Sequence, residues 1–167
     1  LIRDNGVKGV VIKLGNKFSN IQLIEKDIIE VGAATLDRKI ANFALENGLS
    51  NLEFLSCIPG SIGGSVAMNS GCYDGDISKI LVSVKVIDID KCVEKEIKRN
   101  EIEFFYRGTS LPAEVIITSV KLKGKLEDKK IIKKKQESYI EKKKLSQPSQ
   151  IKTCGSTFKN ISSEKKA

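Results

Sequence analysis

The chain has 167 residues, a net charge of +8 and 40% hydrophobic residues, which suits one full domain with an appendage. Because it has no histidine and no C-x-x-C pair among its four cysteines, we expect no metal site and exclude Ser-His-Asp and Cys-His nucleophiles. Apolar runs stay well below the roughly 18 residues of a membrane span, so we expect a cytoplasmic protein without a membrane partner.

The first predicted elements are short strands at residues 9–14 and 27–31, both rich in β-branched residues and bounded by Gly, Asn and Ser. Thr35 is expected to cap a helix that ends at Asn47 and Gly48 in a left-handed stop. Apolar residues fall on one face of this helix, namely Leu36, Ile40, Phe43 and Ala44. The first half is therefore predicted to be based on a sheet.

Four glycines and three serines interrupt the apolar residues of the range 58–71. Glycine clusters where a backbone lets another molecule approach its amides closely. The range fits neither a P-loop nor the G-x-G-x-x-G fingerprint, but its amides precede a predicted helical turn at 66–68 and could hold a diphosphate. A glycine-rich turn packed against another strand explains these residues equally well.

A hairpin is predicted next, from the alternation over residues 80–88 and 92–97. Asp88 and Asp90 lie between these strands without the glycine and distal glutamate of a calcium loop, so we predict a turn there. Residues 115–122 are dense enough in β-branched side chains to form a buried strand.

The positive charge is concentrated in residues 123–144, which hold ten lysines and four acidic residues. A helix is predicted from about residue 127, with acids in its first turn and lysines in its last, and the range 145–148 ends it with a proline. We interpret it as a solvated basic helix, with an anion-facing role for its last lysines as the alternative. Such confined charge and an aromatic content of 5% disfavour nucleic-acid binding.

Three motifs, in the same order, resemble those of the UDP-N-acetylenolpyruvoylglucosamine reductase family. Residues 52–73 resemble its FAD-binding signature, and residues 105–107 (Phe-Tyr-Arg) resemble its Tyr-Arg motif. Residues 155–160 (Gly-Ser-Thr-Phe-Lys-Asn) resemble its Gly-Ser-x-Phe-Lys-Asn motif. The resemblance covers essentially the whole chain.

This resemblance implies an α+β fold. Residues 1–123 would form an FAD-binding domain of the vanillyl-alcohol-oxidase type, residues 124–148 a basic helix and linker, and residues 149–167 the start of a small α+β substrate-binding domain. In such enzymes NADPH reduces FAD, which passes hydride to UDP-N-acetylglucosamine enolpyruvate and yields UDP-N-acetylmuramate for peptidoglycan. The implied partner is thus a small UDP-sugar, with no obligate protein partner.

The resemblance also implies roles for single residues. Arg107 would stabilise an enolate-like intermediate, for which a permanently cationic planar fork is suited, and Ser156 would be the proton donor. Tyr106, Lys144 and Asn160 would bind the substrate, with Lys142 or Lys143 as alternatives to Lys144. The expected FAD contacts are Pro59, Gly60, Ser61, Ile62, Gly63, Gly64, Ser65, Asn69 and Gly71.

The chain departs from the family pattern at both ends. Residues 1–4 resemble the segment just after the family's first FAD-contacting loop, so that loop is expected to be missing. After Asn160 the family's catalytic glutamate is also missing, and Glu164 does not replace it. Two hypotheses follow: a reductase whose full activity needs the missing parts, or a non-catalytic remnant that keeps a flavin- or nucleotide-binding fold.

Overall fold

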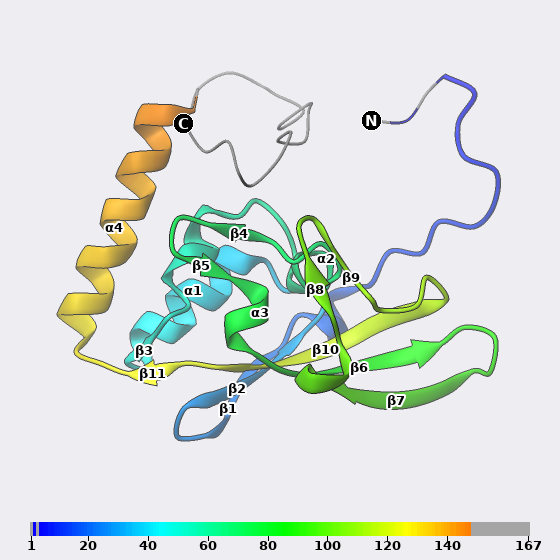
Figure 1. The fold of residues 1–167 in the computed structure, drawn as a ribbon, viewed down its shortest axis with the longest axis horizontal. Helices are drawn as coiled ribbons and strands as arrows, with labels where there is room; N and C mark the ends of the chain where they lie inside the picture. Colours follow the sequence, from blue (N-terminus) through cyan, green and yellow to red (C-terminus); the bar gives the residue numbers. More distant parts are fainter. Residues whose placement is uncertain (1, 3, 148–167) are drawn as a thin grey trace.

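The computed structural model describes residues 2 and 4–147 and contains one main sheet (Figure 1). This antiparallel, five-stranded sheet has the order β1-β2-β10-β6-β7. Its strands are β1 (Ile21–Glu25), β2 (Ile28–Gly32), β10 (Val115–Lys123), β6 (Leu81–Asp88) and β7 (Val93–Lys98). Three short pairs complete the strands: β3 (Leu49–Ser50) with β11 (Lys125–Leu126), β4 (Gly71–Cys72) with β5 (Gly75–Asp76), and β8 (Phe104–Phe105) with β9 (Gly108–Thr109).

Helices cover one face of this sheet, as Figure 1 shows for α1, α2 and α3. The helices are α1 (Asp37–Glu46), α2 (Ile62–Ala67), α3 (Ile77–Ile80) and α4 (Lys129–Ser146). Short 3-10 turns occur at η1 (Asn16–Phe18), η2 (Glu53–Cys57) and η3 (Arg99–Glu101). Within the described residues, none of the helices has both the length and the apolar character needed to cross a membrane.

The core lies between the sheet and the helices. Val31, Val120 and Val84 lie opposite one another across β2, β10 and β6, and all three are 0% exposed. Burying such a side chain stabilises the fold by about 1.5–3 kcal/mol. Ile40 of α1 and Val66 of α2 belong to the same buried cluster, so the glycine-rich segment is anchored to the core by its apolar positions.

Most of the predicted elements are confirmed. The predicted strands at 27–31 and 115–122 correspond to β2 and β10. The predicted hairpin is β6 and β7, and the Asp88 carboxylate accepts a bond from the Lys91 amide in its turn, at 3.2 Å. The predicted α+β fold is thus present, and β1 is an addition that sequence reasoning missed.

The strand predicted at residues 9–14 is wrong. This segment contains no helix or strand, and Val10 and Val11 are 89% and 81% exposed. A strand needs a partner for its backbone groups, and no described strand pairs with this segment. Its β-branched side chains therefore do not suffice to make it a strand.

The start of α1 also differs from the prediction. Thr35 does not cap the helix, because its Oγ1 is buried without a hydrogen-bond partner among the described residues. Leu36 holds the N-cap position and is 52% exposed, so it does not belong to the buried face. The predicted stop is confirmed, since Gly48 has a φ of +68°.

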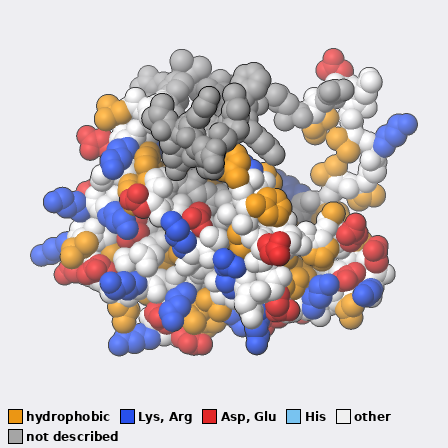
Figure 2. Space-filling view, in the orientation of Figure 1, with side chains coloured by type: hydrophobic (Ala, Val, Ile, Leu, Met, Phe, Trp, Pro, Cys, Tyr) orange, Lys and Arg blue, Asp and Glu red, His pale blue; other side chains and the backbone are white. Residues whose placement is uncertain are grey.

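Helix α4 follows the prediction more closely. Asp128 caps it, accepting a bond from the Lys130 amide at 2.6 Å, whereas its first turn contains no acid. Tyr139, Ile132 and Gln136 are its buried residues. Figure 2 shows Lys and Arg side chains interspersed with Asp and Glu on the visible face, so charges of both signs share this surface.

Candidate functional site

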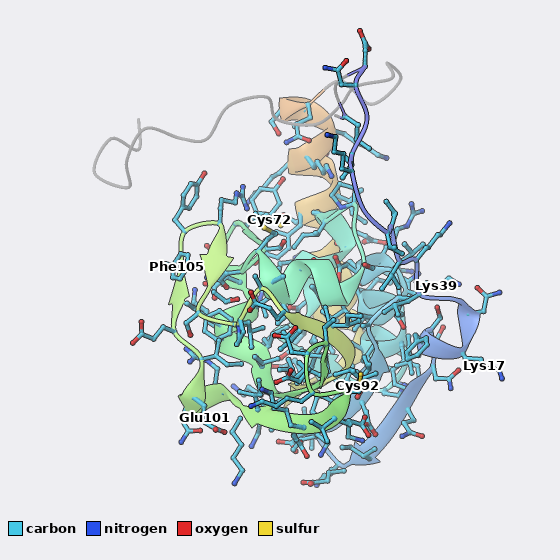
Figure 3. All side chains as sticks on the ribbon, turned by 90° about the vertical axis from the view of Figure 1, so that its right-hand side faces the viewer. Lys17, Lys39, Cys72, Cys92, Glu101 and Phe105 are labelled. Atoms are coloured by element: carbon cyan, nitrogen blue, oxygen red, sulfur yellow. The ribbon has the colours of Figure 1, made fainter. Side chains whose placement is uncertain are left out.

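The glycine-rich segment forms one wall of a cleft with a volume of about 780 Å³. The β8–β9 turn contributes Arg107, the β4–β5 turn contributes Tyr73, and the last turn of α4 contributes Lys143. Figure 3 shows Cys72 of β4 and Phe105 of β8 toward the same end of the molecule. The other lining residues are Cys57, Ile58, Pro59, Gly60, Ser61, Gly64, Ser65, Met68, Ser70, Gly71, Cys72 and Gln147.

The backbone of this segment is held partly by the protein itself. The Ile62 amide donates to the Thr35 carbonyl at 2.9 Å, and the Gly63 amide donates to the Ala33 carbonyl at 3.0 Å. These two amides are therefore engaged within the protein. The alternative of a glycine-rich turn packed against a strand end thus describes this part of the segment.

Gly63 and Gly64 differ in the space available for a side chain. A Cβ on Gly63 would lie 3.0 Å from the Ala33 Cβ, whereas among the described residues a Cβ on Gly64 would meet only the Ser61 Oγ, at 3.9 Å. Gly64 is exposed and lines both the cleft and a smaller hollow of about 500 Å³ on the other side of α2. Packing of the described residues therefore does not explain the glycine at 64.

Ser65 connects the cleft wall to a buried carboxyl group. Its Oγ donates to the Asp37 Oδ2 at 2.6 Å, and the two residues are 3% and 0% exposed. Burial raises the pKa of Asp37 to about 6, while the bond from Ser65 lowers it. The Asp37 amide also donates to the Gly60 carbonyl at 3.0 Å, so the start of α1 fixes this wall.

Arg107 lies in the turn between β8 and β9, with a backbone φ of 61°. A non-glycine residue in this conformation carries strain of about 1 kcal/mol or more, a feature that concentrates at functional sites. The guanidinium lies 5.2 Å from the centre of the Tyr106 ring. The Asn69 side-chain Nδ2 donates to the Phe105 carbonyl at 3.3 Å, and its Oδ1 accepts from the Ser78 backbone N–H at 3.2 Å. Asn69 therefore holds β8 against the glycine-rich segment.

Helix α4 is attached to two other walls of the cleft. Its Lys143 Nζ donates to the Cys57 carbonyl at 2.6 Å. Its Tyr139 ring stacks on Tyr73 at 4.8 Å, and the Tyr139 hydroxyl donates to Asp74 at 3.2 Å. Burial, followed by the negative charge of Asp74, raises the pKa of Tyr139 to about 12. The tyrosine therefore stays protonated and keeps donating.

An ion pair also holds α4 against η2. Lys135 lies 3.5 Å from the carboxylate of Glu53, whose side chain is 2% exposed. Removing one partner of such a pair leaves a buried charge uncompensated.

Several of the predicted site residues come together at the cleft. These are Pro59, Gly60, Ser61, Gly64, Ser65, Gly71 and Arg107. At position 71 the fold itself requires a glycine, because a Cβ there would lie 2.7 Å from the Gly75 carbonyl oxygen in the β4–β5 pair. Ser156 and Asn160 lie outside the described residues.

Other predicted residues lie elsewhere. Ile62 is 0% exposed in the core, Gly63 lines the smaller hollow, and Asn69 uses its side chain between the β8–β9 turn and α3. Tyr106 is 56% exposed. Lys144 is exposed outside the cleft lining, and its neighbour Lys143 is the lysine that lines the cleft.

Sequence reasoning did not single out Tyr73 as a site residue, although it lines the cleft with a φ of 54°. The tight Tyr-Asp-Gly turn was the signal that could have identified it.

The chain is similar to a known domain family and to known reductases. Residues 1–92 match the model of a family described as FAD binding domain. A UDP-N-acetylenolpyruvoylglucosamine reductase of Pelagibacter ubique is 43% identical over 160 residues, which cover 96% of this chain and 53% of the relative. The reductase of the same name from a Jannaschia species is 41% identical, with 96% and 51% covered.

A solved structure supports the same relationship. The crystal structure of UDP-N-acetylenolpyruvylglucosamine reductase from Thermus caldophilus matches with a TM-score of 0.77 and 34% identity, covering 86% of this chain and 51% of that one. The chain thus spans about half the length of these relatives. From the fold, the glycine-rich wall and these matches together, we conclude that the chain belongs to the FAD binding domain family and resembles these reductases over nearly its whole length.

Proposed function

We propose that the cleft binds FAD and that the chain serves the NADPH-dependent reduction of UDP-N-acetylglucosamine enolpyruvate to UDP-N-acetylmuramate, in the cytoplasm. Gly64 is the observation that carries this proposal. It lines the hollows on both sides of α2, and no atom of the residues that the structure describes requires a glycine there. A bulky ligand that lies close to α2 would need a position without a side chain there.

The charge of the cleft supports an anionic ligand. Arg107 and Lys143 line it from separate elements, and no acidic side chain of the described residues belongs to the lining. The diphosphate of FAD and the UDP group of the substrate are both anions that such a cleft attracts. Gly60, Ser61, Gly64 and Ser65 would hold the cofactor along the glycine-rich wall.

Bound FAD would supply hydride transfer, which no protein side chain can perform. The contribution of Arg107 is a fixed positive charge near the substrate carboxylate, where negative charge develops during reduction. Lys143, or Lys144 after a local rearrangement, supplies a point charge for a phosphate, and Tyr106 and Asn160 complete the substrate contacts. Ser156 is proposed as the proton donor, in the part of the chain that begins the substrate-binding domain at 149–167.

The alternative is a protein that binds flavin without catalysing the reduction. Visible absorbance of the purified chain separates the two functions. Bound flavin that NADPH bleaches and the enolpyruvyl substrate reoxidises supports the reductase. Flavin that binds without these changes supports the binding function alone, and a colourless chain that takes up no added FAD overturns the proposal.

A further inference from the structure

The hydroxyl group of Ser65 lies between the cleft and a buried carboxylate. Ser65 lines the cleft, and its Oγ donates to the Asp37 Oδ2 at 2.6 Å. An ionised carboxylate only accepts hydrogen bonds, so the direction of this bond is fixed whenever Asp37 is charged. A serine hydroxyl has one proton to donate, and in this structure that proton is committed to Asp37.

Resting on the FAD site proposed above, we propose that Asp37 is a positioning residue that leaves Ser65 only an acceptor toward the cleft. The ligand group at Ser65 is then a donor, namely a ribityl hydroxyl or the ring N–H of the flavin, and not a phosphate oxygen.

The surroundings of Asp37 favour this assignment. Its side chain is fully buried, its amide is bonded to the Gly60 carbonyl, and its Oδ1 has no hydrogen-bond partner among the described residues. Among the described residues, burial and the bond from Ser65 account for the shift of its pKa, and no charged side chain contributes. A phosphate beside Ser65 would thus meet an uncompensated negative charge, whereas a hydroxyl or N–H would not.

Flavin analogues test which group faces Ser65. FAD, FAD methylated at the ring N–H and FAD lacking single ribityl hydroxyls are titrated at pH 8, where Asp37 is ionised, into the wild type and Ser65→Ala. We expect Ser65→Ala to weaken FAD about tenfold, as for one hydrogen bond. The analogue that lacks the donor facing Ser65 should already bind the wild type about tenfold more weakly than FAD does. For this analogue, Ser65→Ala should cause no further loss of affinity. An equal loss on Ser65→Ala for every analogue overturns the proposal.

Inorganic pyrophosphate, used as a competitor of FAD, is the matched probe for the phosphate group. It should compete equally well with the wild type and with Ser65→Ala. Weaker competition in Ser65→Ala would show that Ser65 donates to phosphate and would overturn the assignment.

A measurement without flavin tests the committed proton separately. Carbon-13 NMR of labelled aspartate carboxyl groups follows Asp37 in the wild type and in Ser65→Ala, with Asp37→Asn identifying its signal. Loss of the Ser65 donor should raise the Asp37 pKa above its wild-type value, and an unchanged pKa overturns the link. A wild-type chain that binds no FAD overturns the proposed function and the flavin donor together, while this measurement still decides whether Asp37 holds the Ser65 proton.

Discussion

The Gly63 amide donates to the Ala33 carbonyl at 3.0 Å, and a methyl group on Gly63 would lie 3.1 Å from that same carbonyl oxygen. Helix α2 therefore packs against the end of β2 through a position without a side chain. For the next residue, Gly64, the Ser61 Oγ is the only atom within 4 Å of a notional Cβ in the part of the chain that the structure describes. Packing thus requires a glycine at 63 but not at 64, and substitution of each residue can distinguish the two positions.

Gly64→Ala should lower FAD affinity while leaving the fold intact. The added methyl group enters the cleft, and alanine in a helix interior is favoured over glycine by about 0.5–1 kcal/mol. Visible-absorbance titration measures the affinity and urea unfolding the stability. Gly63→Ala is the matched control and should lose about 1–3 kcal/mol through overpacking against Ala33. Equal effects of both substitutions on stability would contradict this division.

Arg107→Gly should not destabilise the fold, because glycine adopts a φ of 61° without the strain of a side chain. The same substitution should slow flavin reoxidation by the enolpyruvyl substrate about 100-fold, as expected for the loss of one charge-stabilising group. Stopped-flow absorbance follows both half-reactions. Reduction by NADPH should be nearly unchanged, and a parallel loss in both half-reactions would remove Arg107 from this role.

Tyr139 should stabilise the fold chiefly through its ring. Tyr139→Phe keeps the stack on Tyr73 and removes only the bond to Asp74, so it should cost about 1 kcal/mol. Tyr139→Ala also removes the ring, which is 4% exposed, and should cost about 3–5 kcal/mol. Thermal unfolding of both variants compares these costs. Similar losses would show that the hydroxyl, and not the stack, fastens α4.

Asp37 should make the fold less stable as pH rises. Its pKa is raised to about 6 from 3.8, so the folded state binds more protons between these values. The free energy of unfolding should therefore fall by about 2 kcal/mol from this group as pH rises from 4 to 7. Urea unfolding of the wild type and Asp37→Asn at both pH values isolates this contribution as a difference of slopes. Identical slopes would show that Asp37 has an ordinary pKa.

The sequence predicts the central sheet and α1 because their apolar patterns match their burial. The sequence does not predict β1, because the apolar residues of this strand are not buried. Leu23 and Ile24 are 45% and 39% exposed. Residues 9–14 have the composition of a strand but do not form one. Composition is a local property of the chain, whereas a strand also needs a partner strand.

Positions within the site are harder to predict than its existence. Composition cannot separate Gly63 from Gly64, because the distinction depends on whether Ala33 lies behind the glycine. Lys143 and Lys144 are likewise identical in chemistry, and only the direction of each side chain from α4 decides which one lines the cleft. Asp37 has no motif around it, and its role depends on a contact across 28 positions of sequence.

The attachments of α4 have a consequence for cooperativity. Lys135 and Lys143 bind η2, and Tyr139 packs on the β4–β5 turn. Because one helix binds both η2 and the β4–β5 turn, we expect α4 and the cleft walls to open in a single step in native-state hydrogen exchange. The segment whose composition is most typical of a solvated spacer would then belong to the same folding unit as the glycine-rich wall.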